Sequence, residues 1–312
     1  MILSVSRRTD IPAFYSDWFF ECLEKGYVLV PNPINPKKIA KIPLKKFEVT
    51  SVFTNLVGDK DAQTDGNVEG IVFWSKNPQP LLSKIDKLKD YVFYTLYTLN
   101  AYPDWVEGGL PSIEDRINTF IELSHYCPVI WRYDPILLTK GIDVDWHIKN
   151  YKYLCESLKG YTKHCKISFV IPSYSGCSKD VYPPNEKEKD VILSNFKEIA
   201  KANGIQIEAC AVGVDLSKYD IAPSKCIDGE IFEVLLTQKY QDKGLSFKRK
   251  NNKIDGQRKY CGCMPAVDIG RYDTCNHNCN YCYARKSTHA SMLDKLNGEV
   301  YEKKTEFMFD IT

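Results

Sequence analysis

Three cysteines in the stretch from Thr274 to Tyr283 follow a C-x3-C-x2-C pattern, with an aromatic residue directly before the last one. The thiols belong to Cys275, Cys279 and Cys282. Three thiols so close together cannot all pair as disulfides, and thiolates bind soft transition metals. Zinc usually uses C-x2-C pairs and needs four ligands for a closed structural site. Three ligands on one short loop instead fit a [4Fe–4S] cluster with one iron left open.

A second group of thiols lies in the same part of the chain, outside this loop. Four cysteines are the number that a closed [4Fe–4S] cluster needs. We therefore predict a second cluster that is ligated by Cys210, Cys226, Cys261 and Cys263. The alternative is that Cys210 is a small buried apolar residue and Cys226 an ordinary loop thiol.

Composition narrows the class of protein. The chain has 312 residues, 44% of them hydrophobic, and a net charge of +2, which gives no general attraction to nucleic acid or membrane. No apolar run reaches the roughly 18 residues of a membrane span. Arg7 and Arg8 superficially resemble a twin-arginine export signal, but no apolar segment follows them. We expect a cytoplasmic protein, in which twelve cysteines indicate metal binding rather than disulfides.

Charged residues follow several of the apolar segments. Arg7, Arg8 and Arg132 come just after strand patterns, where a guanidinium could bind a cofactor carboxylate or a substrate phosphate. Ion pairs with Asp10 or Asp134 are the alternative for these arginines. Lys76 is a similar candidate. We assign Arg132, Asp134 and Lys76 to the catalytic group.

The elements that position these residues alternate along the chain. Strand patterns are predicted at 2–6, 28–30, 47–53, 70–74, 92–99, 129–131, 166–171, 206–212 and 266–270. Helical patterns are predicted after Asp10 and Ser112, at 79–89, around 148–158, at 185–203 and at 230–241. Strands separated by helices at this spacing predict parallel βαβ units. We expect an α/β fold, a (β/α) barrel of the triosephosphate-isomerase type with about eight units, and a doubly wound parallel sheet is the alternative.

The predicted barrel is one domain over residues 1–282, including a cysteine-rich segment at about 261–283, and residues 283–312 form a polar tail packed on it. In such barrels, active sites lie at the carboxyl ends of the strands. This rule would place the arginines, Lys76 and the cysteine loop on one face.

Several motifs resemble members of the family named domain of unknown function 1848. They are Ser6–Ala13, Val72–Pro78, Trp131–Pro135, Cys226–Gly229, Cys261–Cys263, Asp268–Gly270 and Tyr281–Ala284. The resemblance covers nearly the whole chain. Members of this family look like relatives of the radical S-adenosylmethionine (SAM) barrels, and the spore photoproduct lyase branch is the nearest comparison.

The resemblance implies a [4Fe–4S] cluster on the cysteine loop whose open iron binds SAM. Electron transfer from a donor such as flavodoxin or ferredoxin would cleave SAM, and the resulting radical would abstract hydrogen from an unknown substrate. Arg7, Arg8 and Tyr281 are the implied cofactor-binding residues, Tyr281 beside the adenine. The cluster loop normally follows the first strand, whereas here it follows the last, as in a circular permutation. That order predicts that the loop lies beside Arg7, Arg8 and Asp10.

The sequence is also compatible with other functions. A cluster or zinc site closed by a fourth cysteine such as Cys263 would make the protein a non-catalytic electron carrier or redox sensor. Repair of DNA lesions is a third hypothesis, supported by the lyase comparison and by the basic segment from Lys243 to Lys259, although a solvated linker is the favoured interpretation of that segment. We interpret His277 as a spacer that contacts solvent or backbone rather than as a ligand.

Overall fold

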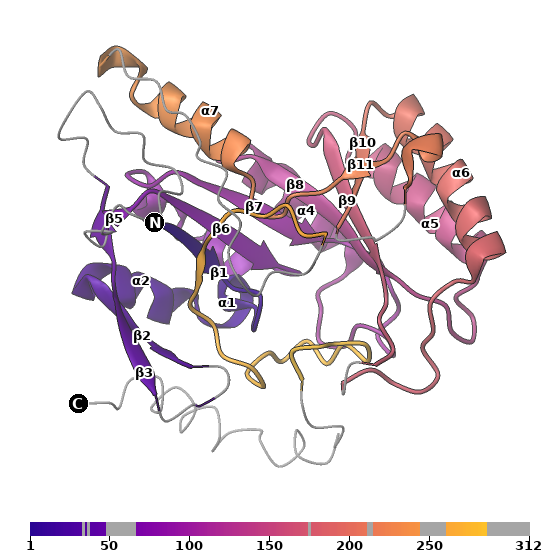
Figure 1. The fold of residues 1–312 in the computed structure, drawn as a ribbon, viewed down its shortest axis with the longest axis horizontal. Coiled ribbons are helices and arrows are strands. Elements are labelled where there is room, and N and C mark those ends of the chain that lie inside the picture. The colour runs from indigo at the N-terminus through magenta and orange to yellow at the C-terminus, as the bar shows by residue number, and fades with distance from the viewer. Residues whose placement is uncertain are drawn as a thin grey trace.

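The structure is a computed structural model that describes residues 1–32, 35, 38–47, 67–173, 176–210, 215–243 and 260–285. Its centre is an eight-stranded sheet in the order β11-β10-β9-β8-β7-β6-β1-β12 (Figure 1). The strands are β1 (Ile2–Val5), β6 (Gly70–Ser75), β7 (Phe93–Thr98), β8 (Val129–Ile136), β9 (His164–Phe169), β10 (Gln206–Ala209), β11 (Ala222–Pro223) and β12 (Val267–Asp268).

Every neighbouring pair in this sheet is parallel. The α/β class and the parallel sheet are therefore confirmed. Within the described residues, the outer strands β11 and β12 do not pair with each other, so the hydrogen-bonded ladder is open at this point. Strand β11 was not predicted, because two residues are too few to carry a periodic pattern.

The connecting helices are α1 (Ile11–Phe14), α2 (Ser16–Lys25), α3 (Gln79–Leu82), α4 (Ile113–Ser124), α5 (Val144–Ser157), α6 (Glu186–Ala202) and α7 (Gly229–Lys239). Short 3₁₀ turns are η1 (Ile85–Leu88), η2 (Ser217–Tyr219) and η3 (Gln241–Lys243). The helix predicted at 79–89 is divided into α3 and η1. None of the described helices combines the length and the apolar composition needed to cross a membrane.

Two small sheets lie outside the central one. Strands β2 (Tyr27–Pro31) and β3 (Ile39–Pro43) form an antiparallel pair, and β4 (Lys45–Lys46) pairs with β5 (Asn67–Val68). The strand predicted at 28–30 therefore exists, but it pairs with β3 and is not a unit of the central sheet. The strand predicted at 47–53 lies outside the described residues, apart from Phe47. The polar tail beyond residue 285 and the basic segment after Lys243 also lie outside them.

The two faces of the central sheet pack against different partners. Strand side chains alternate between faces, and one set packs with α2, α4, α5 and α6 in a large cluster that includes Phe73, Trp131 and Phe196. The other set, including Val72 and Tyr94, packs against α7 and residues near Cys226. Figure 1 shows α7 apart from the adjacent helices α5 and α6. We call these the helical face and the α7 face.

Candidate active site

The cysteine loop lies beside the first strand of the chain. Strand β12 immediately precedes the loop and pairs with β1 through Leu3 opposite Val267 and Ser4 opposite Asp268. The predicted neighbourhood of the last and first strands is therefore confirmed. Because these strands are parallel, the residues that follow both of them emerge at one edge of the sheet.

Asp268 holds this edge together. Its buried carboxylate accepts hydrogen bonds from Ser4 Oγ and Ser6 Oγ, each at 2.8 Å, and from the backbone N–H of Arg7 at 2.8 Å. It also forms ion pairs with Arg7 Nε at 3.3 Å and Arg8 Nε at 3.6 Å. The alternative given for these arginines, an ion pair, thus exists, but the partner is Asp268 rather than Asp10 or Asp134. Both guanidinium groups are engaged by the protein itself.

Asp10 anchors the cysteine loop from α1. Its carboxylate caps α1 through the N–H of Ala13 and also accepts from Ser75 Oγ at 2.7 Å and the N–H of Lys76 at 2.7 Å. The fourth partner is His277 Nε2, at 2.8 Å. The His277 side chain is 2% exposed and packs on the Phe14 ring. The interpretation of His277 as a spacer is therefore corrected: it is a buried anchor.

Glu107 is a second anchor, and sequence reasoning did not select it. Its buried carboxylate pairs with Lys76 Nζ at 2.6 Å and accepts from Asn100 Nδ2 at 2.8 Å and from the Tyr281 hydroxyl. Burial raises the pKa of the Glu107 carboxyl, but Lys76 and Arg116 outweigh this effect and hold the pKa below its ordinary value. Lys76 Nζ also donates to the Tyr281 hydroxyl at 2.9 Å. The predicted residues Lys76 and Tyr281 are thus brought together by an unpredicted carboxylate.

The backbone of the cysteine loop is clamped from two sides. On one side, the backbones of Glu107 and Cys279 form an isolated antiparallel β-bridge, and the N–H of Asn280 donates to Val106 O at 3.0 Å. Gly109 has φ +71°, and a Cβ there would lie 3.1 Å from Asn276 O. On the other side, a Cβ at Gly176 would lie 2.1 Å from Cys282 O, so only glycine allows this approach. The sequence signal for the first clamp was the pair of glycines directly after Glu107.

Two of the three loop thiols, those of Cys279 and Cys282, lie near the Lys76 ammonium. Burial raises the pKa of Cys275 to about 12 and also raises the pKa values of Cys279 and Cys282, whereas Lys76 lowers those of Cys279 and Cys282. Cys279 is 6% exposed. Among the described residues, no three His, Cys, Asp or Glu side chains are arranged as a ligand set for a metal ion. The donor type still fits an iron–sulfur cluster, because a cluster attaches each thiolate to a different iron and so does not gather them around one ion.

Arg132 and Asp134 lie on β8 and form an ion pair. The guanidinium also lies 5.0 Å from the centre of the Trp74 ring. Ser168 donates to Asp134 from the neighbouring strand β9. The ion pair that was the alternative for Arg132 therefore exists, and the catalytic role of the pair stays a prediction. Lys166 lies opposite Arg132 on β9, and its Nζ lies 2.6 Å from Glu208 Oε2.

The four remaining cysteines are close to one another. Cys226 Sγ lies 3.6 Å from Cys210 Sγ, and the backbone N–H of Cys226 donates to Cys263 Sγ at 3.2 Å. Cys261 is a hydrogen-bond partner of Cys263. The four cysteines that were grouped from the sequence therefore lie close together. Their geometry does not identify a bound group.

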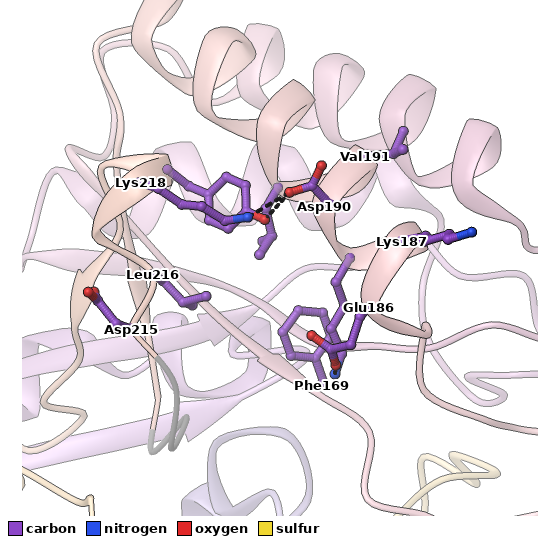
Figure 2. A pocket seen from close by; sticks show the side chains of 11 residues that line it. Phe169, Glu186, Lys187, Asp190, Val191, Asp215, Leu216 and Lys218 are labelled. Atoms are coloured by element: carbon purple, nitrogen blue, oxygen red, sulfur yellow. Dashed lines mark hydrogen bonds and ion pairs between the residues drawn. The ribbon is translucent and has the colours of Figure 1, made fainter.

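A surface pocket of about 630 Å³ lies elsewhere, between α6 and η2 (Figure 2). Asp190 bonds to Lys218 and Tyr219 across it. Its lining contains none of the predicted site residues; it consists of Phe169, Glu186, Lys187, Lys189, Asp190, Val191, Leu193, Asp215, Leu216, Lys218 and Tyr219.

Comparison with known proteins agrees with the motifs noted above. No curated protein and no solved structure matches the chain significantly. A family model described as "Domain of unknown function (DUF1848)" matches residues 2–284. Because that match spans most of the chain, this protein belongs to the DUF1848 family.

Proposed function

We propose that this protein is a radical SAM-like enzyme whose cysteine loop carries a [4Fe–4S] cluster with one iron open to SAM. The observation that carries the proposal is the anchoring of a three-thiol loop at the carboxyl ends of β1 and β12, which are parallel neighbours in the eight-stranded sheet. Buried carboxylates hold that loop, Asp10 through His277 and Glu107 through Tyr281. Active sites of parallel α/β folds lie at this edge of the sheet.

The proposal includes a permuted, barrel-like arrangement of the sheet. Supporting it, β12 lies next to β1, so the loop emerges where a cluster loop after the first strand would emerge. The chemistry that such a cluster supplies is one-electron reductive cleavage of SAM, which yields methionine and a hydrogen-abstracting 5′-deoxyadenosyl radical. Flavodoxin or ferredoxin is the proposed class of electron donor, and the substrate is unknown.

The protein's own residues have defined tasks under this proposal. Glu107 fixes the Lys76 ammonium and the Tyr281 hydroxyl, so that a positive charge stands beside the thiolates. Because Arg7 and Arg8 are bound to Asp268, their task is to position the loop edge. Arg132 and Asp134 are the polar pair that we assign to substrate binding.

The test is product formation under anaerobic conditions. Protein reconstituted with iron and sulfide is reduced with dithionite and mixed with SAM, and 5′-deoxyadenosine is quantified by chromatography. We expect product from the wild type, none from Cys279→Ala, and wild-type amounts from the matched control Cys22→Ala, whose thiol is buried on the helical face. Bound iron without any SAM cleavage would instead support the non-catalytic electron carrier.

A further inference from the structure

We propose that Cys210, Cys226, Cys261 and Cys263 form a second metal centre, closed by four thiolates and separate from the cysteine loop. The separation follows from packing. Cys226, with the partly buried Cys210 and Cys263 against it, belongs to the cluster on the α7 face, whereas Cys279 and Cys282 belong to a different cluster with Tyr102 and Val106. The two groups of thiols therefore have different surroundings.

Three segments that are distant in sequence bring the four thiols together. Cys210 directly follows β10, Cys226 lies between β11 and α7, and the C-x-C pair precedes β12. The contacts run from Cys210 to Cys226 at 3.6 Å between sulfurs, then from the Cys226 backbone to Cys263 Sγ at 3.2 Å. Ile227 N also donates to Cys263 Sγ, at 3.4 Å. Bringing thiols from three segments to one place is what a metal site requires and what apolar packing does not.

Two cations lie near this group of thiols. Arg132 on β8 and Lys166 opposite it on β9 are close enough to Cys226 to act on its thiol electrostatically. Because Arg132 is paired with Asp134 and Lys166 with Glu208, these cations offset only part of the charge that four thiolates would bring to a bound metal.

A packing role does not explain this arrangement. The packing thiols Cys155 and Cys165 are buried in the large apolar cluster of the helical face, whereas Cys210, Cys261 and Cys263 are only partly buried. Four thiolates leave no open position, so the centre is one that is structural or carries electrons. A [4Fe–4S] cluster and a zinc ion share this ligand set, and the side chains in the described structure are not gathered around one point for a single ion. The experiment separates the two metals.

The test measures metal per chain in anaerobically purified full-length protein. Iron and zinc are determined by mass spectrometry and sulfide by acid release, for the wild type, Cys226→Ser, Cys261→Ser, Cys279→Ser and the control Cys22→Ser. Cys261 is only partly buried, so Cys261→Ser tests the centre even if the buried Cys226→Ser variant fails to fold. Circular dichroism confirms folding of each variant.

We expect Cys226→Ser and Cys261→Ser each to lose either about four irons with their sulfide or about one zinc. The first result assigns a cluster and the second a zinc ion, while Cys22→Ser retains the wild-type content. Cys279→Ser should lose only the iron of the cysteine loop, so failure of the second centre and failure of the proposed SAM chemistry are distinguishable. Unchanged metal in folded Cys261→Ser, or a Cys210–Cys226 disulfide in the native protein, would overturn the proposal.

Discussion

Cysteines on the helical face lie among apolar side chains, whereas two of the cysteines near the carboxyl edge of the sheet have cations close by. Cys22, Cys127 and Cys155 lie among apolar side chains of the large cluster, where burial raises each pKa to about 12. Cys226 faces Arg132 and Lys166, and Cys279 faces Lys76. Neighbouring cations thus distinguish Cys226 and Cys279 from Cys127 and Cys155, whereas Cys275 resembles the packing cysteines, because burial raises its pKa to about 12 as well.

Alkylation should expose that difference most strongly. A pKa of about 12 against an ordinary 9.0 reduces the thiolate fraction about a thousandfold, in addition to the effect of burial. In native protein treated with a chelator, iodoacetamide should modify Cys261 readily and leave Cys22, Cys127 and Cys155 unmodified until the chain unfolds. Peptide mass spectrometry measures each rate. Equal rates for the two groups would remove the basis of the comparison.

Loss of the Glu107 carboxylate, which anchors the cysteine loop, should lower the free energy of unfolding substantially. Glu107→Gln leaves the Lys76 ammonium without its buried counter-charge, and breaking a buried pair costs about 3–5 kcal/mol. Urea unfolding measures the change in the free energy of unfolding. The control is Glu24→Gln, which removes an exposed pair with Lys87 and should cost less than about 1 kcal/mol. Similar losses in both variants would show that Glu107 does not anchor the loop.

Protonation of the buried His147 on α5 should change the free energy of unfolding by a slightly smaller amount. Its Nε2–H donates to Leu137 O at 2.7 Å, and Nδ1 accepts from the Tyr133 hydroxyl at 2.8 Å, so the buried ring is neutral. Burial lowers its pKa from 6.5 to about 4. Because the unfolded state binds the proton first, stability should rise by about 3 kcal/mol from pH 4 to pH 6.5 and then level off.

Urea unfolding across that pH range, compared between the wild type and His147→Gln, isolates this contribution. The exposed His125→Gln serves as the matched control and should keep the wild-type pH dependence. A His147→Gln variant with the same pH dependence as the wild type would contradict the assignment.

The sequence alone predicted the features that follow from repeated apolar segments and from the number and spacing of the cysteines. Alternating apolar segments predicted the parallel sheet, and the position of the last strand predicted its place beside β1. The two groups of cysteines were also separable by spacing. The segments and the cysteine spacing are local patterns that a single sequence shows directly, whereas the β1–β12 neighbourhood came from the expected barrel order.

What sequence reasoning missed depends on long-range pairing. Nothing near Glu107 indicates that its partners are Lys76 and Tyr281, which lie 31 and 174 positions away. The alternative considered for Arg7 and Arg8 was an ion pair with Asp10 or Asp134, whereas Asp268 reaches them through the β1–β12 pairing. The strand at 28–30 was found, but its partner β3 could not be inferred, since pairing is decided by contacts and not by propensity.

The central claim is that the cysteine loop leaves one iron open to SAM. The most direct measurement is the paramagnetic resonance spectrum of the dithionite-reduced protein with and without SAM, recorded in the Cys261→Ser variant so that the loop cluster dominates. The account predicts that SAM changes the spectrum and that Cys279→Ala abolishes both the signal and the change. A bound, reducible cluster in the loop whose spectrum is identical with and without SAM would contradict the account.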